Sequence, residues 1–409
     1  MSVNPQNDIH DAFAELPYLD DPGPLYGRLR SEAPVLRSPN GFWYVSSYEL
    51  VNQAIRRPAV FACDKSTALD EGDPYTRDPQ NRRYSKVMAS IILSQDGDVH
   101  RRLRNIVKDV FSRRGIATFR TLVRSAIDAQ FDEAVDGVPG RAFDLKERFC
   151  LPIPTKIILQ IFGVPPAEAH RFYEMSDTII RPLDAGTPDQ WHEHASAVFD
   201  RHWQFVVDAA EERRRAPGDD LLTRIATARE NGAYLSDIEL VAFVSFLITA
   251  GYETVANTFA NGVHRLLQHP DQLAALRADP SRLPAAVEEI LRYEPATRNT
   301  APRFVAQETE LGGHTLHRGE MVYLGLQSAN RDPAVFADPE SFDTTRSPNP
   351  HLGFGAGPHA CIGMALARLE LEEGLSALLA RFPTLRAGGE PQWRRSMIIR
   401  GLESLPVQW

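Results

Sequence analysis

One long helical segment constrains the fold of this chain more than any other feature of its sequence. Ser236 is a favourable N-cap residue, and the helical pattern continues to Gln268, where His269–Pro270 ends it. At about 1.5 Å per residue such a helix extends roughly 48 Å, which is enough to cross an entire domain. We therefore expect the other elements to be arranged around this central helix.

Helical patterns dominate the rest of the chain as well. The further helices that we expect are Ser47–Arg57, Asp98–Phe111, Ala117–Val135, Pro154–Phe162, Ala167–Ile180, Gln190–Arg215, Asp219–Arg229, Pro270–Leu276, Pro284–Arg292 and Cys361–Ala380. Short strands are expected at Val35–Leu36, Gly41–Val45, Val305–Leu311, Met321–Leu324 and Met397–Arg400. A polar, irregular loop is predicted from Ala62 to Ser94. The predicted fold class is mainly α with small β-sheets, in one domain spanning residues 1–409.

The composition argues against several classes of protein. The chain has 54 acidic residues against 45 Lys and Arg residues, a formal net charge of -9, which does not favour nucleic-acid binding. Its longest apolar stretch, Leu240–Ala250, is shorter than the ~20 residues that cross a bilayer. The segment Met1–Glu15 lacks the basic start and apolar core of a signal peptide. Three cysteines are too few and odd in number for a disulfide framework. We expect a cytoplasmic protein.

A glycine-rich loop from Phe354 to Gly363 contains the residue with the most informative chemistry, Cys361. Glycines such as Gly355 allow the backbone to approach a flat ligand closely. A cysteine at the start of a helix is favoured as the thiolate, and a thiolate is a strong haem ligand. The alternative is a small buried thiol beside a glycine turn. A nucleotide-binding loop is disfavoured because no Lys-Ser/Thr pair follows the glycines.

Three further motifs lie at other places along the chain. Ala250-Gly251-Tyr252-Glu253-Thr254 places glycine and threonine in the middle of the long helix, where both cost stability, and this indicates a functional kink or bulge. The alternative is a core helix whose hydroxyl bonds its own backbone. Glu289 and Arg292 share a helix face, as do His100 and Arg104; each pair alone is also compatible with a solvated surface.

Together these four motifs, taken in their order along the chain, resemble the cytochrome P450 family of haem-thiolate monooxygenases over nearly the whole sequence. The resemblance implies haem b held by Cys361, with dioxygen as co-substrate and the long helix crossing the distal haem face. It implies that Thr254 hydrogen-bonds dioxygen and that Glu253 relays protons. The residues implied to hold the cofactor are His100, Arg104, Arg303 and His359 at the propionates, and Phe354, Gly355 and Gly363 in the haem loop.

Other positions gain a structural interpretation from the same resemblance. Glu289 and Arg292 correspond to a buried structural pair that Arg346 completes. The chain departs from the family pattern at Val255, where a second hydroxyl is common, and at Gly97 and Asp98, where prolines are usual. The departure at Val255 weakens the expectation of a relay with two hydroxyls.

The resemblance also suggests which residues form the substrate pocket. The candidates are Ile91, Phe246, Leu247, Ala250, Ala296, Arg298 and Met397. Arg298 is unusually polar for this position, so one hypothesis pairs it with a substrate carboxylate, and the alternative is that it points away.

A ferredoxin and its reductase are the implied electron donors for a small-molecule substrate, because the chain has no redox module of its own. The arginines at positions 101, 102, 113 and 114 are candidate contacts for an acidic ferredoxin. Two alternatives stay open. The first is a related enzyme that desaturates, couples rings or carbon atoms, or uses peroxide. The second is a haem- or ligand-binding module without catalysis.

Overall fold

The computed structural model describes residues 8–69, 83–135, 142–180, 189–230 and 232–409. Its helices are α1 (Ile9–Ala14), α2 (Gly23–Glu32), α3 (Tyr48–Ile55), α4 (Arg83–Ser90), α5 (Gly97–Val107), α6 (Arg113–Ala117), α7 (Arg120–Val135), α8 (Pro152–Ile161), α9 (Ala169–Ile180), α10 (Asp189–Arg215), α11 (Leu221–Thr227), α12 (Asp237–Gln268), α13 (Pro270–Ala278), α14 (Leu283–Tyr293), α15 (Leu326–Ala329) and α16 (Met364–Arg381). The prediction of a mainly α fold is confirmed.

The strands are short and form small sheets. They are β1 (Val35–Arg37), β2 (Trp43–Val45), β3 (Phe61–Ala62), β4 (Ala142–Asp144), β5 (Arg229–Glu230), β6 (Ala233–Tyr234), β7 (Arg303–Val305), β8 (Thr309–Leu311), β9 (His314–Leu316), β10 (Met321–Leu324), β11 (Arg386–Ala387), β12 (Gln392–Trp393), β13 (Leu402–Ser404) and β14 (Pro406–Gln408). The largest sheet has the order β1-β2-β10-β7-β3, with β2 and β10 parallel. A second sheet, β11-β14-β4, joins the carboxyl end to the middle of the chain.

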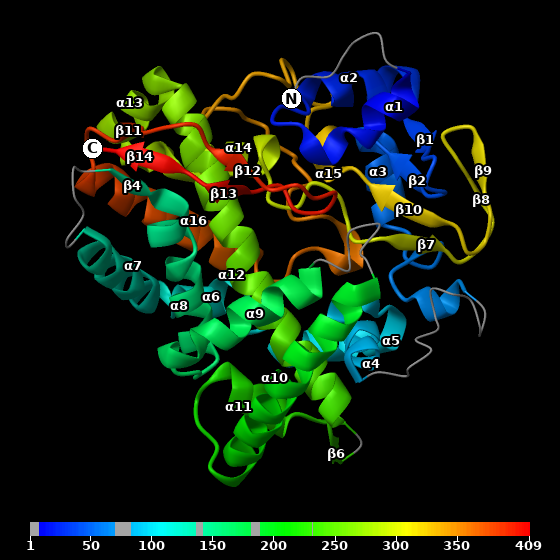
Figure 1. Ribbon diagram of the computed structural model, residues 1–409, viewed down its shortest axis with the longest axis vertical. Helices are drawn as coiled ribbons and strands as arrows, with labels where there is room; N and C mark the ends of the chain where they lie inside the picture. The colour runs from blue at the N-terminus through cyan, green and yellow to red at the C-terminus, as the bar shows by residue number, and fades with distance from the viewer. Residues whose placement is uncertain (1–7, 70–82, 136–141, 181–188, 231) are drawn as a thin grey trace.

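The long helix α12 runs through the centre of the molecule. It lies between the five-stranded sheet on the right of Figure 1 and the helices α7, α8, α13 and α16 on the left. Ser236 and Glu239 form a capping box at its start, and His269 follows its last residue. Its length and composition would suit a membrane span, but 61% of its most apolar window is buried by the rest of the protein. That burial is typical of a core helix.

The structure differs from the sequence-based prediction at several places outside α12. α4 lies inside the segment that was predicted to be an irregular loop, and α2 was not predicted at all. The expected strand Val305–Leu311 is divided between β7 and β8, which belong to different sheets. Residues 397–400 form only one isolated bridge, between Thr297 and Ile399, instead of a strand. Alternation of apolar residues does not reveal where a strand leaves one sheet for another.

A first group of buried ion pairs fixes α14 against the loop before the glycine-rich segment. Glu289 is fully buried, and both of its oxygens accept from Arg292, at 2.7 and 2.8 Å. Arg346 adds a further contact to Glu289 at 3.2 Å. The Nη1 group of Arg292 donates to the carbonyls of Asn330 and Pro339. The structural interpretation of these three residues therefore agrees with their positions.

A second group of buried ion pairs surrounds Glu294, whose side chain is inaccessible to solvent. Arg265, Arg331 and Arg400 all contact its carboxylate. Arg400 also donates to the carbonyls of Leu19 and Asp20, near the amino end of the chain. This second group thus connects the beginning of the chain to its end.

Candidate functional site

A cavity of about 280 Å³ lies between α12 and the loop that precedes α16. On one side it is lined by Phe246, Leu247, Ala250 and Thr254 of α12. On the other side, Phe354, Gly355, Cys361 and Gly363 line it, so all the haem-loop residues predicted from the sequence lie at one surface. Most of the other lining residues are apolar. The arrangement suits a flat, largely apolar ligand held between a helix and a loop.

Cys361 presents its sulfur to this cavity from just before α16. Its backbone N–H donates to the carbonyl of Phe354 at 2.9 Å, which closes the loop. α16 begins at Met364, so the cysteine precedes the helix by slightly more than predicted. Burial raises the pKa of the Cys361 thiol, while the N–H of Gly363 and the charges of Arg104 and Arg368 act in the opposite direction. This hydrogen bond and these two positive charges favour the thiolate that metal binding requires.

Backbone conformation and close packing explain why glycine occupies several positions of the loop. Gly355 and Gly357 have φ angles of +66° and +70°, a region that L side chains rarely adopt. A Cβ at Gly363 would lie 3.9 Å from the Cys361 sulfur and would cover part of its surface. The loop therefore keeps both the backbone and the sulfur accessible to a ligand in the cavity.

Four basic side chains line one end of the cavity: His100, Arg104, Arg303 and His359. The rings of His100 and His359 lie with their centroids 4.1 Å apart and their planes tilted by 39°. Arg303 is buried, and its Nε has no hydrogen-bond partner among the described residues. Burial, followed by the charges of His359 and Arg104, lowers the pKa of His100 to about 4. The buried guanidinium of Arg303 is a cation without a matching anion among the described residues, which is costly, and this indicates that this end of the cavity accommodates the anionic groups of a ligand.

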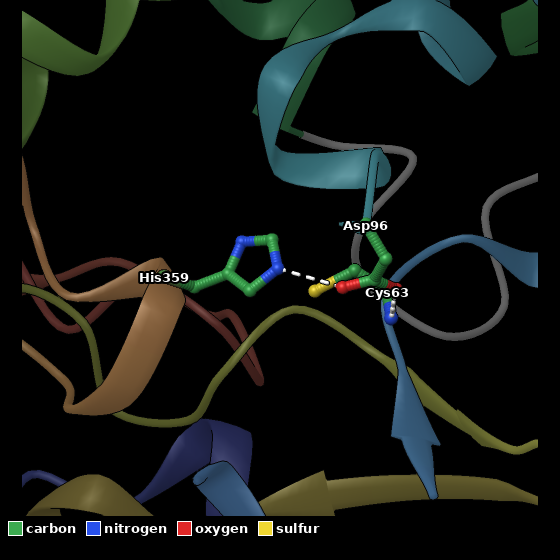
Figure 2. A group of neighbouring side chains, drawn as sticks. All are labelled: Cys63, Asp96 and His359. Carbon is green, nitrogen blue, oxygen red and sulfur yellow. Dashed lines mark hydrogen bonds and ion pairs between the residues drawn. The ribbon is translucent and has the colours of Figure 1, made fainter. Parts of the chain in front are cut away.

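His359 is held from outside the cavity by Asp96, as Figure 2 shows. The Nε2 of His359 lies 2.8 Å from Oδ1 of Asp96. The sulfur of Cys63 is close enough that one ligand atom from each of the three residues lies within 4.8 Å of the others. Burial raises the pKa of the Cys63 thiol to about 12, so this sulfur is protonated at neutral pH. Asp96 and Cys63 were not singled out from the sequence.

On α12, the two residues predicted to handle protons point to different environments. Thr254 lines the cavity, and its hydroxyl donates to the carbonyl of Ala250 at 2.8 Å. Glu253 is buried on another side of the helix, where one oxygen accepts from Arg394 at 2.7 Å and the other from Ser176 of α9. Glu253 is not among the residues that line the cavity. Thr254 thus faces the cavity, as the family resemblance implies. Its hydroxyl is also bonded to the backbone of its own helix, as the alternative interpretation implies.

Gly251 in the same motif has a packing role. α12 is α-helical throughout Asp237–Gln268, so it contains no π-helical bulge at this motif. A Cβ at Gly251 would lie 2.9 Å from Ile158 of α8. The glycine is therefore needed because α8 and α12 approach each other closely at this point, which a local sequence pattern does not reveal.

These features meet the requirements of a haem-thiolate site. A porphyrin is flat and apolar and carries two carboxylates, and the cavity combines apolar walls with one basic end. A cysteine sulfur supported by a backbone N–H faces the same space. The residues present therefore fit haem b, and the site defines a haem-thiolate protein.

Comparison with known proteins establishes the family. A sequence model described as cytochrome P450 matches residues 67–396. "Cytochrome P450 107B1" of Saccharopolyspora erythraea is 37% identical over 407 residues, covering 97% of this chain and 96% of that protein. 6-Deoxyerythronolide B hydroxylase of the same organism is 36% identical over 395 residues, covering 94% and 95%. The chain belongs to the cytochrome P450 family of haem-thiolate monooxygenases, oxidoreductases that use dioxygen.

Solved structures agree with this assignment. The structure of P450BioI in complex with a fatty-acid-ligated acyl carrier protein superposes with a TM-score of 0.87 at 30% identity, covering 97% of this chain and 100% of that one. An enzyme for C–S bond formation in chuangxinmycin biosynthesis superposes with a TM-score of 0.83 at 33% identity, covering 95% and 94%. Both similarities extend over nearly the entire fold.

The predicted substrate residues divide into two groups. Phe246, Leu247, Ala250 and Ala296 line the cavity. Ile91 and Met397 are buried elsewhere, each beside a residue that does line it. Arg298 is fully buried away from the cavity, and its Nη1 donates to the carbonyl of Leu16 at 2.6 Å. This placement corresponds to the alternative in which Arg298 points away, and it does not support contact with a substrate carboxylate.

Several lining residues were missed by the sequence analysis. They are mostly apolar side chains or threonines from segments that were otherwise correctly located: Ile92, Leu93, Ile180, Thr297, Thr300, Ile398 and Ile399. One missed residue is acidic. Glu370 of α16 lines the cavity, is 98% buried, and neither carboxylate oxygen has a partner among the described residues. Nothing in the sequence around Glu370 indicates that its carboxyl is buried at the cavity wall.

Proposed function

We propose that this protein inserts one oxygen atom of dioxygen into a small organic molecule in the cytoplasm, with electrons supplied one at a time by a ferredoxin and its reductase. The observation that carries the proposal is the cavity shared by Cys361, by four basic side chains and by Thr254. The relatives named above include a hydroxylase, which supports the choice of reaction.

Cys361 and the basic end of the cavity have the binding roles in this proposal. Cys361 ligates the iron through its sulfur, and the N–H of Gly363 stabilises the negative charge on that sulfur. His100, Arg104, Arg303 and His359 bind the two haem carboxylates. When bound, haem activates dioxygen, and a thiolate ligand promotes cleavage of the O–O bond by donating electron density to the iron.

Glu253 and Thr254 have the proton-transfer roles. The Thr254 hydroxyl holds a proton at Oγ1 on the cavity wall, where dioxygen would be bound. Glu253 is held by Arg394, whose side chain is 24% exposed and therefore reaches water. A Glu253 carboxylate that takes up a proton from water on that side and rotates away from Arg394 would carry the proton toward Thr254 and return as the carboxylate. General acid catalysis of this kind contributes about 10²–10⁴-fold to rates.

The walls near Thr254 indicate the chemical class of substrate. Phe246, Leu247, Ile180 and Ile398 are apolar, and the polar groups of the lining include the hydroxyls of Thr297 and Thr300 and the carboxyl of Glu370. A molecule that is mainly apolar, with few hydrogen-bonding groups, would bury its surface here most favourably. Arg298 contributes no positive charge to this wall because it is directed to Leu16.

The electron donor would dock on the Cys361 side of the molecule. Arg113 and Arg114 are exposed on α6, which packs against α16, the helix that follows Cys361. An acidic ferredoxin would be attracted to this surface. Arg101 and Arg102 are less available because they pair with Asp98 and with Glu230 and Glu239, respectively.

Spectroscopy and isotope labelling test the proposal. The purified holoprotein, reduced and exposed to carbon monoxide, should show the absorption typical of sulfur ligation, and Cys361→Ser should abolish it. Compounds that shift the haem Soret band are then incubated with NAD(P)H, a surrogate ferredoxin and its reductase under labelled dioxygen. A product carrying one labelled oxygen atom is expected.

Other outcomes would replace the proposal. An unlabelled dehydrogenated or coupled product would identify the alternative enzyme, and turnover with peroxide alone would identify a peroxygenase. Tight binding of a compound without any turnover would favour a binding module. Thr254→Ala separates these possibilities further, because a proton-handling role predicts continued NAD(P)H consumption with loss of product and release of peroxide.

A further inference from the structure

Asp96 occupies a position where an aspartate ordinarily caps a helix, but its carboxylate is used elsewhere. It is the N-cap residue of α5, and its side chain makes no capping hydrogen bond. One oxygen, Oδ2, instead accepts from the backbone N–H groups of Cys63, at 2.6 Å, and Asp64, at 2.9 Å. The other, Oδ1, pairs with His359 at 2.8 Å. Because caps are generally stabilising, this alternative use indicates a specific role.

The carboxylate of Asp96 is suited to hold His359 firmly. Burial raises the pKa of Asp96, but the hydrogen bonds from His359 and from the two amides outweigh this effect and lower it. Asp96 is therefore ionised at neutral pH. The side chains of His359 and Asp96 are only 5% and 14% exposed, so water competes weakly for their contact. Figure 2 shows Asp96 and His359 approaching each other from separate chain segments.

Asp96 connects the parts of the protein that form the basic end of the cavity. Its backbone begins α5, which carries His100 and Arg104. Its side chain contacts the segment after β3 and the loop that carries His359. The neighbouring rings of His100 and His359 lie on two of the segments that Asp96 connects. A shift of Asp96 would therefore move His359 relative to the other basic groups.

We propose that Asp96 is a positioning residue that fixes the imidazole of His359 for contact with a haem carboxylate, and thereby slows the loss of haem. The inference rests on the proposed role of His359. Outer-sphere partners that orient a histidine typically change affinity by roughly 10- to 100-fold when they are removed, and we expect the lower end of this range because three other basic residues remain.

Haem loss from the holoprotein to an excess of apomyoglobin gives a readout that does not depend on activity. Asp96→Asn is the principal variant because an amide oxygen can still accept from the Cys63 and Asp64 amides. It should lose haem about ten times faster than the unmodified protein. The matched control is Asp98→Asn, since Asp98 lies on the first turn of the same helix, is 90% exposed and pairs with Arg101. This control should lose haem at the unmodified rate.

A double-mutant cycle with His359→Ala distinguishes positioning from general stabilisation. If Asp96 acts through His359, the double variant loses haem no faster than His359→Ala alone. If Asp96→Asn accelerates the loss equally in both backgrounds, its role is merely structural and the proposal is overturned. Should Asp96→Asn fail to fold, Asp96→Ser replaces it because it also lacks the carboxylate, and an unmodified rate of haem loss in the folded variant also overturns the proposal.

The cycle also separates failure of this inference from failure of the function proposed above. If His359→Ala accelerates haem loss but Asp96→Asn does not, the role of Asp96 is wrong and that of His359 stands. If His359→Ala retains haem like the unmodified protein, both assignments fail. In either case the reduced carbon-monoxide spectrum tests Cys361 independently.

Discussion

The buried arginines of this protein occupy two contrasting environments. Around Glu289, the guanidinium of Arg292 meets a carboxylate and several carbonyls, and its charge is fully matched. At the basic end of the cavity, one nitrogen of the buried Arg303 is unpartnered among the described residues, and the half-buried Arg104 has no ion-pair partner among them. The first arrangement is complete without a ligand, whereas the second could accept an anionic one, as the proposed function requires. At these two sites, the matching of charge separates a structural arginine from the arginines that we propose to bind a ligand.

The largest effect is expected where the matched group is broken. Glu289→Ala removes the acceptor for Arg292, Arg346 and the N–H of Asp343, leaving a buried cation unpaired. Loss of one partner of such a pair typically costs 3–5 kcal/mol. We expect the free energy of unfolding, measured by urea denaturation, to fall by about this amount. A loss below about 1 kcal/mol would contradict the distinction between the two environments.

Glu370 gives the next largest effect, since it is a buried carboxyl with no matching cation among the residues that the structure describes. Burial raises its pKa well above the ordinary value of 4.5. A raised carboxyl pKa stabilises the protein below the ordinary pKa, and this contribution is lost as the pH rises through the folded-state pKa. We expect the free energy of unfolding, measured across this pH range, to fall less steeply with rising pH in Glu370→Gln than in the unmodified protein. At pH values above the folded-state pKa, the variant should be more stable by about 1–3 kcal/mol.

A control for this prediction uses a carboxylate of the opposite kind. Glu288 pairs with Arg368 and His351. Burial raises its pKa, but the hydrogen bonds from these two partners outweigh that effect and lower it to about 2. Its contribution is therefore lost only as the pH falls toward that value. Glu288→Gln should not reproduce the change expected at high pH, and identical profiles for both variants would argue against the assignment for Glu370.

Arg303→Ala tests the unmatched environment directly. Because Arg303 has no carboxylate partner among the described residues, its removal should change the free energy of unfolding by less than about 1 kcal/mol. Haem transfer to apomyoglobin should nevertheless become roughly tenfold faster, which corresponds to 1.4 kcal/mol of binding free energy. A large loss of stability without faster haem loss would assign Arg303 to the structural group.

The smallest effect is expected at an exposed pair. Asp98 and Arg101 are 2.6 Å apart, but their side chains are 90% and 69% exposed. Such pairs contribute about 0.3–0.5 kcal/mol, and salt reduces the contribution. Asp98→Ala, measured by the same denaturation in low and high salt, should show this small difference. An effect comparable to that of Glu289→Ala would mean that burial does not determine the contribution of charge pairs here.

The sequence predicted the central helix and the haem loop well because both depend on local signals. Ser236 and His269–Pro270 mark the ends of α12, and the spacing of residues from Phe354 to Gly363 is itself restrictive. Thr254 and the four basic residues were identified through family resemblance, and all five line the cavity. Their roles in binding and proton transfer stay predictions.

Other features depend on contacts between distant segments and were therefore missed. Nothing near Arg298 in the sequence shows that its side chain turns to Leu16. Gly251 was interpreted as the site of a kink or bulge in the helix, and its close approach to Ile158 was not foreseen. Asp96 has the local pattern of a helix cap, and its contact with His359 spans 263 positions of the chain. Such pairings emerge only once the tertiary fold is known.

The attachment of the amino-terminal segment to Arg400 has a consequence for how the protein is made. Carbonyls of Leu19 and Asp20 are the acceptors for a guanidinium that lies 381 and 380 positions further along the chain, respectively. During synthesis on the ribosome, these carbonyls must wait until Arg400 has emerged before their native contacts can form. We therefore expect nascent chains that stop before residue 400 to leave the first helices undocked and susceptible to proteases, however much of the central bundle has already assembled.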